Sequence, residues 1–146
     1  MIRLGRRSQK RERVTVRPGY APRAVDGVGE VRDESVGDRV EVVVLTGEHD
    51  LGTAPHVREA LERVAAQNKA VVIDLCGATF VDSSILGALL EARRGALESG
   101  RGFAVACSGD AEPVRRVLEV TGLADELPAH ASREAALAAL DTQESP

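Results

Sequence analysis

The strongest constraint on the fold is a strand-like run that leads through two adjacent serines into a helix-like run. Residues 70–75 (Ala-Val-Val-Ile-Asp-Leu) form a short, β-branched segment that is typical of a buried strand. Between residues 85 and 97, apolar side chains recur at helical spacing with charged side chains between them. Asp82, Ser83 and Ser84 therefore lie where a strand ends and a helix begins, the position at which open α/β sheets present their sites.

Segments of the same two kinds alternate along the rest of the chain. Strands are predicted at residues 40–45 and 103–107, with a shorter edge strand within residues 28–35. Helices are predicted at residues 55–65, 114–121 and 132–140, the last capped by Ser132. This order predicts a small α/β fold, in which a four- to five-stranded sheet is flanked by about four helices. The run at residues 70–75 is apolar on both faces, which favours a central strand with parallel neighbours.

Charge is divided unevenly between the two parts of the chain. Residues 1–24 contain eight basic residues and one acidic residue, whereas the remainder contains eleven basic and twenty-two acidic residues. We therefore predict a basic, disordered N-terminal extension over residues 1–27, a folded domain over residues 28–141 and a frayed tail over residues 142–146. The extension lacks the motifs of nucleic-acid readers, and the acidic domain suits a phosphate backbone poorly, so no direct nucleic-acid binding is expected.

The apolar runs and the cysteines indicate the compartment. No run approaches the roughly 20 apolar residues that cross a bilayer, and no apolar segment follows the N-terminal charges as in a secretory signal. Cys76 and Cys107 have no second pair and no histidine cluster nearby, which disfavours a zinc site and suits a reducing cytoplasm. We expect a cytoplasmic protein that contacts no membrane and binds no metal or cofactor; the oligomeric state stays open.

Enzyme chemistry has weak support in the sequence. Ser84, His49 and Asp50 are the residue types of a hydrolytic triad, but adjacent His49 and Asp50 are badly placed for one to orient the other toward a serine. No Gly-x-Ser-x-Gly elbow and no glycine-rich nucleotide loop is present. His56 and His130 lack a metal-ligand partner at useful spacing. An enzyme with Ser84 as nucleophile remains a remote alternative to a non-enzymatic protein.

Ser83 and Ser84 have two interpretations on physical grounds. Serine commonly caps the first turn of a helix. A phosphate at the same place would meet free backbone N–H groups and the positive end of the helix dipole, so we expect the fold to tolerate it. It would add about −1.5 to −2 charges at pH 7 beside Asp82, and the loop that carries Glu48 and Asp50 is expected nearby. Such a charge would repel a partner docked on this face.

Four stretches in this order resemble the STAS family, specifically the anti-sigma factor antagonists. They are residues 47–55 (Gly-Glu-His-Asp-Leu-Gly-Thr-Ala-Pro), the strand at residues 71–75, residues 81–84 (Val-Asp-Ser-Ser) and residues 114–123. The resemblance covers roughly residues 28–141. It implies a STAS-like fold, in which a mixed sheet of four to five strands carries about four helices.

The resemblance also implies a phosphorylation switch. In this family an anti-sigma factor that is also a serine kinase phosphorylates the second serine of Asp-Ser-Ser, and a metal-dependent serine phosphatase removes the phosphate. The unphosphorylated protein binds the anti-sigma factor and thereby releases the sigma factor. By position the acceptor is Ser84, with Ser83 less favoured. The residues expected to contact the partner are Glu48, His49, Asp50, Thr53, Asp82, Ser83, Ser84 and Ile85.

One residue departs from the family pattern beside the expected acceptor. Ile85 stands where the family usually has glycine, and a β-branched side chain there is expected to narrow the approach of a kinase. A STAS interaction module that binds its partner without phosphorylation is therefore the alternative function.

Overall fold

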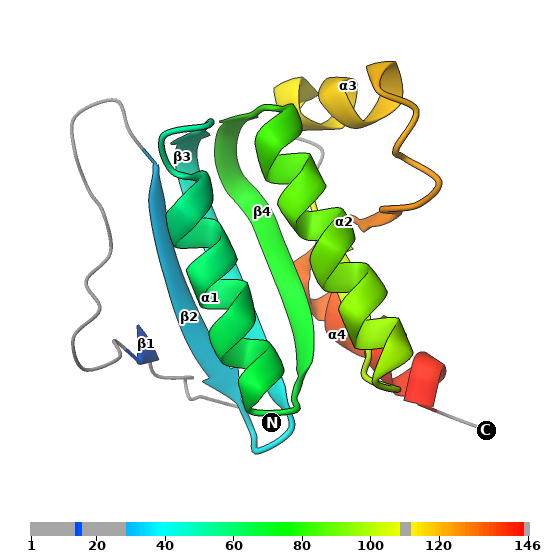
Figure 1. Cartoon of the computed structure of the whole chain (residues 1–146). Helices are drawn as coiled ribbons and strands as arrows, with labels where there is room; N and C mark the ends of the chain where they lie inside the picture. Colours follow the sequence, from blue (N-terminus) through cyan, green and yellow to red (C-terminus); the bar gives the residue numbers. More distant parts are fainter. Residues whose placement is uncertain (1–13, 16–28, 109–111, 145–146) are drawn as a thin grey trace.

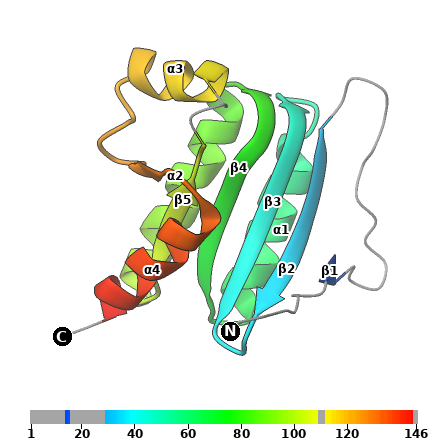
Figure 2. The same ribbon diagram turned by 180° about the vertical axis from the view of Figure 1, so that it is seen from behind.

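The computed structural model describes residues 14–15, 29–108 and 112–144, which form a mixed sheet with helices on both faces (Figures 1 and 2). The predicted α/β class, with a mixed sheet and about four helices, is confirmed. Four to five strands were expected, and two strands of two residues each, at the two sides of the sheet, bring the number among the described residues to six. In chain order the elements are β1 (Val14–Thr15), β2 (Glu30–Val36), β3 (Val40–His49), α1 (Ala54–Ala66), β4 (Ala70–Val81), α2 (Ser83–Glu98), β5 (Phe103–Ala106), α3 (Glu112–Val120), β6 (Ala129–His130) and α4 (Arg133–Glu144).

The order of the strands across the sheet follows their order in the chain. β2 pairs antiparallel with β1 and β3, whereas β4 pairs parallel with β3 and β5, and β6 pairs parallel with β5. The apolar run at the start of β4 is thus central between parallel neighbours, as predicted. β1 belongs to the predicted N-terminal extension, whose other residues, 1–13 and 16–27, lie outside the described part of the chain.

Two apolar cores lie on opposite faces of the sheet. The front core fills the space between the sheet and helices α1 and α2, and α3 contributes Val114 and Leu118 to it (Figure 1). On the opposite face α4 lies against the sheet (Figure 2). The back core lies there, and Val72 of β4 belongs to it together with Ala136 and Leu140. The aliphatic side chains of β3, β4 and β5 alternate between the two faces, so each of these three strands contributes to both cores.

Strands β3 and β4 extend further than the sequence predicts. We expected them to end near residues 45 and 75, but their parallel pairing continues to His49 opposite Val81. The pairing is irregular at two places, with register shifts between Val44 and Thr46 and between Gly47 and Glu48. Gly47 has a φ of 82°, a left-handed backbone conformation that favours glycine. The predicted loop at residues 47–55 therefore begins only after His49.

The last helix is also longer than expected. Ser132 Oγ accepts a hydrogen bond from Ala135 N at 3.1 Å, which confirms the predicted cap. α4 then continues to Glu144, although the sequence predicted fraying from residue 142. Ala136 and Leu140, which lie within the predicted part of the helix, are buried against the sheet. Residues 145–146 lie outside the described residues.

Arg133, at the start of α4, connects this helix to two strands. Its Nη1 atom is 2.6 Å from Glu34 Oε1 on β2, and its Nη2 and Nε atoms are each 3.0 Å from Asp74 Oδ2 on β4. Both carboxylates are buried, and Glu34 also accepts a hydrogen bond from Arg32 Nε at 3.2 Å. Because β3 lies between these strands, the guanidinium spans three strands and fixes the position of α4 on the back face.

We expect Arg133→Met to lower the free energy of unfolding by about 3 kcal/mol, because it leaves buried carboxylates without their shared cation. The loss should fall at the lower end of the range for such changes, since Glu34 keeps Arg32. Urea denaturation measures it. Arg116→Met is the matched control, because its ion pair with Glu112 is exposed on α3 and should contribute at most about 0.5 kcal/mol. Equal losses in the two variants would contradict a bridging role for Arg133.

Candidate functional site

Helix α2 begins at an aspartate cap beside the two serines. Asp82 has extended backbone angles (φ −108°, ψ −175°), and its Oδ1 atom accepts hydrogen bonds from Ser84 N at 3.0 Å and Ile85 N at 3.2 Å. The same oxygen accepts a hydrogen bond from Ser84 Oγ at 2.6 Å. Asp82 therefore provides the cap that the sequence left open to Ser83 or Ser84, and neither serine hydroxyl serves as the cap.

The two serines differ in exposure. Ser83 is exposed, whereas Ser84 is half-buried, with its hydroxyl directed to Asp82. Ile85 is fully buried in the front core. Its side chain therefore does not narrow the approach to Ser84, and the expected contact between Ile85 and a partner does not hold, because this side chain faces the interior.

The carboxyl group of Asp82 is held in its ionised form. Burial by itself would raise the pKa of Asp82, but hydrogen bonds from the Ser84 hydroxyl and from the amides of Ile85, Ser84 and Leu51 outweigh this effect. The pKa of Asp82 consequently lies below its ordinary value of 3.8. Its carboxylate already occupies the amides that we expected to receive a phosphate, so a phosphate on Ser84 would lie beside a second anion.

His49, at the end of β3, holds the turn that leads into α1. Its ring is buried, with Nδ1 3.0 Å from Thr53 Oγ1 and Nε2 3.0 Å from Thr46 O. Thr53 is buried as well, and its Oγ1 atom accepts a hydrogen bond from Asp50 N at 3.2 Å. The expected contacts of His49 and Thr53 with a partner therefore do not hold, because both side chains are used inside the protein to shape the loop.

The pKa of His49 reflects its location. Burial lowers the pKa of His49 below its ordinary value of 6.5, and this effect outweighs hydrogen bonds to the backbone of Thr46 and Glu30 and the nearby charge of Asp50. The ring is therefore neutral at neutral pH. A neutral ring that donates from Nε2 to the Thr46 carbonyl leaves Nδ1 as an acceptor. The single hydroxyl hydrogen of Thr53 then lies between two acceptors, His49 Nδ1 at 3.0 Å and Asp50 O at 3.2 Å.

The remaining predicted residues come together at one edge of the sheet. Asp82 N donates to His49 O at 3.2 Å, which joins the ends of β3 and β4, and Glu48 lies opposite Phe80 in the parallel register. Glu48 and Asp50 are exposed. We call this surface the carboxyl edge, and it consists of Glu48, Asp50, Leu51, Phe80, Asp82, Ser83 and Ser84.

Two apolar members of the carboxyl edge were not predicted from the sequence. Leu51 is 74% exposed and Phe80 is 42% exposed, unusual values for large apolar side chains. The exposure of Phe80 could have been predicted from the alternation of side chains along a strand. Val81 belongs to the front core, so the preceding side chain is expected on the opposite face of the sheet. The exposure of Leu51 has no such signal, since it depends on the turn that His49 and Thr53 hold.

The residues that were weighed as a hydrolytic triad are not assembled as one. Ser84 Oγ donates to Asp82, whereas His49 bonds to Thr53 and Thr46. Within residues 29–108 and 112–144, no group of three or more His, Cys, Asp or Glu side chains is arranged to hold a metal ion. No helix in the described part of the chain is long and apolar enough to span a membrane.

Comparison with known proteins gives the family. The family model of the STAS domain matches residues 35–136, which include β3, β4, α2 and the whole carboxyl edge. The chain belongs to the STAS domain family. A STAS-domain-containing protein of Pseudomonas aeruginosa is 34% identical over 79 residues, which cover 54% of this chain and 76% of that relative.

Solved structures of STAS proteins have the same fold. An anti-sigma factor antagonist from Mycobacterium paratuberculosis superposes with a TM-score of 0.71 and 30% identity, over 81% of this chain and 98% of that one. The phosphorylated form of SpoIIAA, a Bacillus cell-fate determinant, superposes with a TM-score of 0.55 and 22% identity, over 75% of this chain and 97% of that one. At this identity the likeness to SpoIIAA supports the fold alone.

We expect Asp82→Ala to lower the free energy of unfolding by about 1 kcal/mol at pH 7, because the first turn of α2 loses its cap. Since the pKa of Asp82 lies below 3.8 in the folded protein, its contribution is present above about pH 4 and is lost as the pH falls further. Urea denaturation at pH 7 and pH 3 should therefore show a smaller difference from the wild type at pH 3. Ser83→Ala is the control, and a difference that does not depend on pH would argue against an ionised cap.

We expect Gly29→Ala to destabilise the protein by about 2 kcal/mol or more, because a Cβ atom there would lie 2.2 Å from His49 Nε2 and 2.5 Å from Glu48 O. The matched control is Gly87→Ala in α2, where a Cβ atom meets nothing within 4 Å. That change should be neutral or slightly stabilising, since alanine favours a helix. Thermal unfolding compares the two, and a tolerated Gly29→Ala would show that the packing of His49 is adjustable.

Proposed function

We propose that this STAS protein is a cytoplasmic anti-sigma factor antagonist whose binding is switched by phosphorylation of Ser84. In the unphosphorylated form it binds an anti-sigma factor serine kinase at the carboxyl edge and so releases a sigma factor. The observation that carries the proposal is the Ser84 hydroxyl, which lies at the accessible start of α2 and donates to Asp82. The proposal is also supported by the structural similarity to the anti-sigma factor antagonist from Mycobacterium paratuberculosis, 98% of whose chain is covered.

The proposed partner contact has an apolar centre and an acidic rim. Leu51 and Phe80 present large apolar side chains, which supply binding energy when they are buried at an interface. Glu48, which is opposite Phe80 in the strand register, and Asp50, which precedes Leu51 in the chain, add negative charge to the same surface. A kinase surface with basic side chains around a shallow apolar pocket would complement this edge.

Phosphorylation would act through charge at the start of α2. It removes the hydroxyl hydrogen that Ser84 donates to Asp82 and adds about −1.5 to −2 charges at pH 7. The phosphate must then turn toward solvent or displace the Asp82 carboxylate from the helix amides. A docked partner would have to desolvate this charge. A loss of about 3 kcal/mol in binding free energy weakens binding by roughly two orders of magnitude.

The switch would be reset by a metal-dependent serine phosphatase acting on phosphorylated Ser84. No catalytic role for this chain is needed in the cycle, because the kinase and the phosphatase supply the chemistry. The STAS protein contributes the accessible serine and the surface on which the partner binds.

Binding without phosphorylation is the second candidate function. The observation that favours it is the exposure of the two serines: Ser84 is half-buried and its hydroxyl is already bonded to Asp82 at 2.6 Å, whereas Ser83 is exposed. A kinase must break this hydrogen bond or use it to orient the hydroxyl. In the second candidate function, the carboxyl edge binds its partner and neither serine is modified.

We expect incubation with the cognate anti-sigma factor kinase and Mg-ATP to add one phosphate to the protein, measured as intact mass and mapped to Ser84 by peptide sequencing. Ser84→Ala should abolish the modification, and Ser83→Ala should retain it because its neighbour keeps the acceptor hydroxyl. Ser84→Asp should weaken binding of the kinase by about a hundredfold in a titration.

Three outcomes would count against a switch at Ser84. A phosphate that maps to Ser83 would move the site by one residue. Tight binding of the kinase with no phosphate on either serine would favour the passive module. A Ser84→Asp protein that unfolds at a much lower temperature yet binds as tightly as the wild type would show that Ser84 acts in the fold alone.

A further inference from the structure

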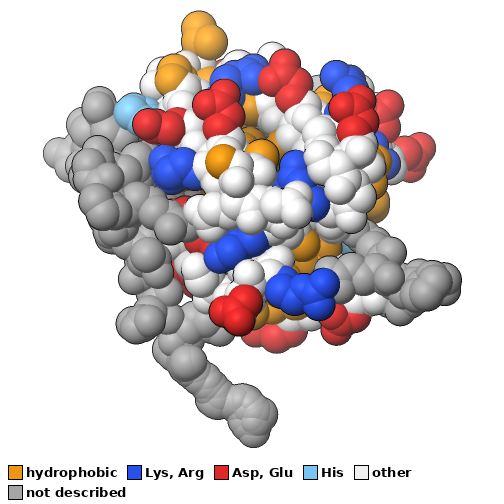
Figure 3. Space-filling model, turned by 60° about the horizontal axis from the view of Figure 1, so that its bottom comes forward, with side chains coloured by type: hydrophobic (Ala, Val, Ile, Leu, Met, Phe, Trp, Pro, Cys, Tyr) orange, Lys and Arg blue, Asp and Glu red, His pale blue; other side chains and the backbone are white. Residues whose placement is uncertain are grey.

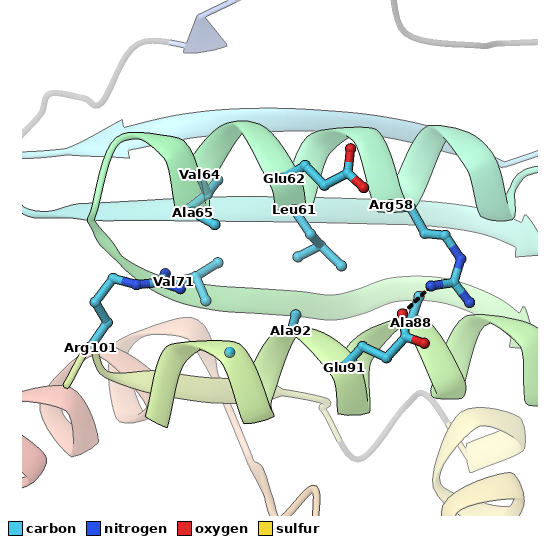
Figure 4. A pocket seen from close by; sticks show the side chains of 11 residues that line it. Arg58, Leu61, Glu62, Val64, Ala65, Val71, Ala88, Glu91, Ala92 and Arg101 are labelled. Carbon is cyan, nitrogen blue, oxygen red and sulfur yellow. Dashed lines mark hydrogen bonds and ion pairs between the residues drawn. The ribbon is translucent and has the colours of Figure 1, made fainter. Parts of the chain in front are cut away.

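A groove with an apolar floor lies between α1 and α2 (Figure 4). It encloses about 190 Å³. Leu61 and Val64 of α1, Val71 of β4 and Ala88 of α2 are buried beneath it. The floor of the groove on the α2 side is made of three small residues, Ala88, Ala92 and Gly95, while Glu91 of the same helix lies at the opening. The small residues leave a slot between the helices.

The two ends of the groove differ in charge. At one end Arg58 of α1 forms an ion pair with Glu91 of α2 across the opening, so these charges compensate each other (Figure 4). At the other end lies Arg101, whose Nη1 atom donates to Lys69 O at 3.0 Å. No carboxylate of the described residues forms an ion pair with Arg101.

A second, polar hollow of about 330 Å³ adjoins the groove at Arg101, which lines both. It is formed where the β2–β3 turn, the α1–β4 loop and the α2–β5 loop meet, and Arg39 and Lys69 line it. The ammonium group of Lys69 forms an ion pair with buried Glu41, with 3.2 Å between Nζ and Oε1. Arg39 forms no ion pair among the described residues, and Asp38, its neighbour in the chain, also lines the hollow. Figure 3, in which this end of the molecule comes forward, shows arginine and lysine side chains interspersed with acidic and hydrophobic side chains and with backbone and uncharged groups.

We propose that the groove and the hollow together bind a single-chain amphiphile with an anionic head group, a carboxylate or a phosphate. The alkyl chain would lie on the apolar floor between α1 and α2, and the head group would meet Arg101 and Arg39. Guanidinium groups suit both head groups, because their planar donors match carboxylate and phosphate oxygens. An apolar floor with a few polar groups around it is typical of small-molecule sites. The polar groups here are the Arg58–Glu91 pair at one end, Glu62 on the α1 side and Arg101 at the other end, so the head group of an anion would bind at the Arg101 end, away from both carboxylates.

The backbone opposes an anion at this end of the fold. α1 ends at Ala66 and α2 at Glu98, so the partial negative charges of both helix C-termini point toward the hollow. Recognition of the head group must therefore come from the full charges of Arg101 and Arg39. This requirement makes the site sensitive to loss of a single arginine.

This site is separate from the carboxyl edge. The polar hollow lies at the N-terminal ends of β3, β4 and β5, whereas the carboxyl edge lies at the C-terminal ends of β3 and β4. The inference therefore does not depend on the proposed function, and either one can fail without the other.

Isothermal titration calorimetry on the full chain tests the proposal, with probes kept below their critical micelle concentrations. Decanoate and decyl phosphate carry both parts of the ligand, decanol lacks the charge, and acetate and inorganic phosphate lack the chain. We expect one molecule of decanoate or decyl phosphate to bind per chain and the other three to bind at least tenfold more weakly. Binding of decanoate alone would identify a fatty acid as the source, and binding of decyl phosphate alone a lipid phosphate.

Two pairs of variants locate the site. A Cβ atom at Gly95 or at Gly87 meets nothing within 4 Å, but only Gly95 lines the groove. We expect Gly95→Leu to fill the slot and weaken binding at least tenfold, and Gly87→Leu to leave it unchanged. Arg101→Gln should also weaken binding about tenfold, because it removes a charged donor. Arg94→Gln is its control, since Arg94 is exposed on α2 and does not line the groove.

The proposal would be overturned by an absence of binding of both decanoate and decyl phosphate. It would also be overturned if decanol bound as tightly as decanoate, or if acetate and phosphate bound as tightly as their decyl analogues. Equal effects of Gly95→Leu and Gly87→Leu would place the ligand elsewhere. Circular dichroism of each variant verifies that it is folded, and Arg101→Gln tests the site without changing the packing of α1 against α2.

Discussion

The parallel pairing of β3 with β4 is the constraint on which the site depends. It continues past two register shifts to His49 and Val81, and this extension brings the turn after β3 and the start of α2 to the same edge of the sheet. The hydrogen bond from Asp82 N to His49 O closes the pairing. If the pairing ended at Gly47, as the glycine there suggests, no backbone hydrogen bonds would fix the loop that carries Glu48 and Asp50 relative to Ser83 and Ser84.

Buried polar groups in this fold are placed where hydrogen bonds or ion pairs compensate them. Asp82 binds two helix amides and the Ser84 hydroxyl, which leaves the serine held in one orientation. His49 is neutral and satisfied by Thr46 and Thr53, and the turn it supports leaves Leu51 exposed. The surface of the carboxyl edge is thus shaped by residues that a partner would not touch.

Sequence reasoning predicted the four longer strands, the helices and the Asp-Ser-Ser position because periodicity and capping act over short distances. It missed β1 and β6, which have two residues each and form only by pairing with β2 and β5. It assigned His49, Thr53 and Ile85 to a partner contact, and burial of their side chains removes them from that role. The error has one cause: residues adjacent in a motif alternate between the surface and the interior. It also missed Leu51 and Phe80, whose exposure follows from the turn and from the end of β4.

The sequence by itself determined the α/β class, the central parallel strand and the start of a helix at Asp82, because these follow from the local order of apolar and polar residues. Only the tertiary structure decided which side chains of the motif reach solvent, how far β3 and β4 run, and that Arg133 joins Glu34 to Asp74 across β3. These features depend on contacts between segments far apart in the chain. A local sequence pattern cannot predict such contacts, because they form, and contribute to stability, only when the sheet and its helices have packed together.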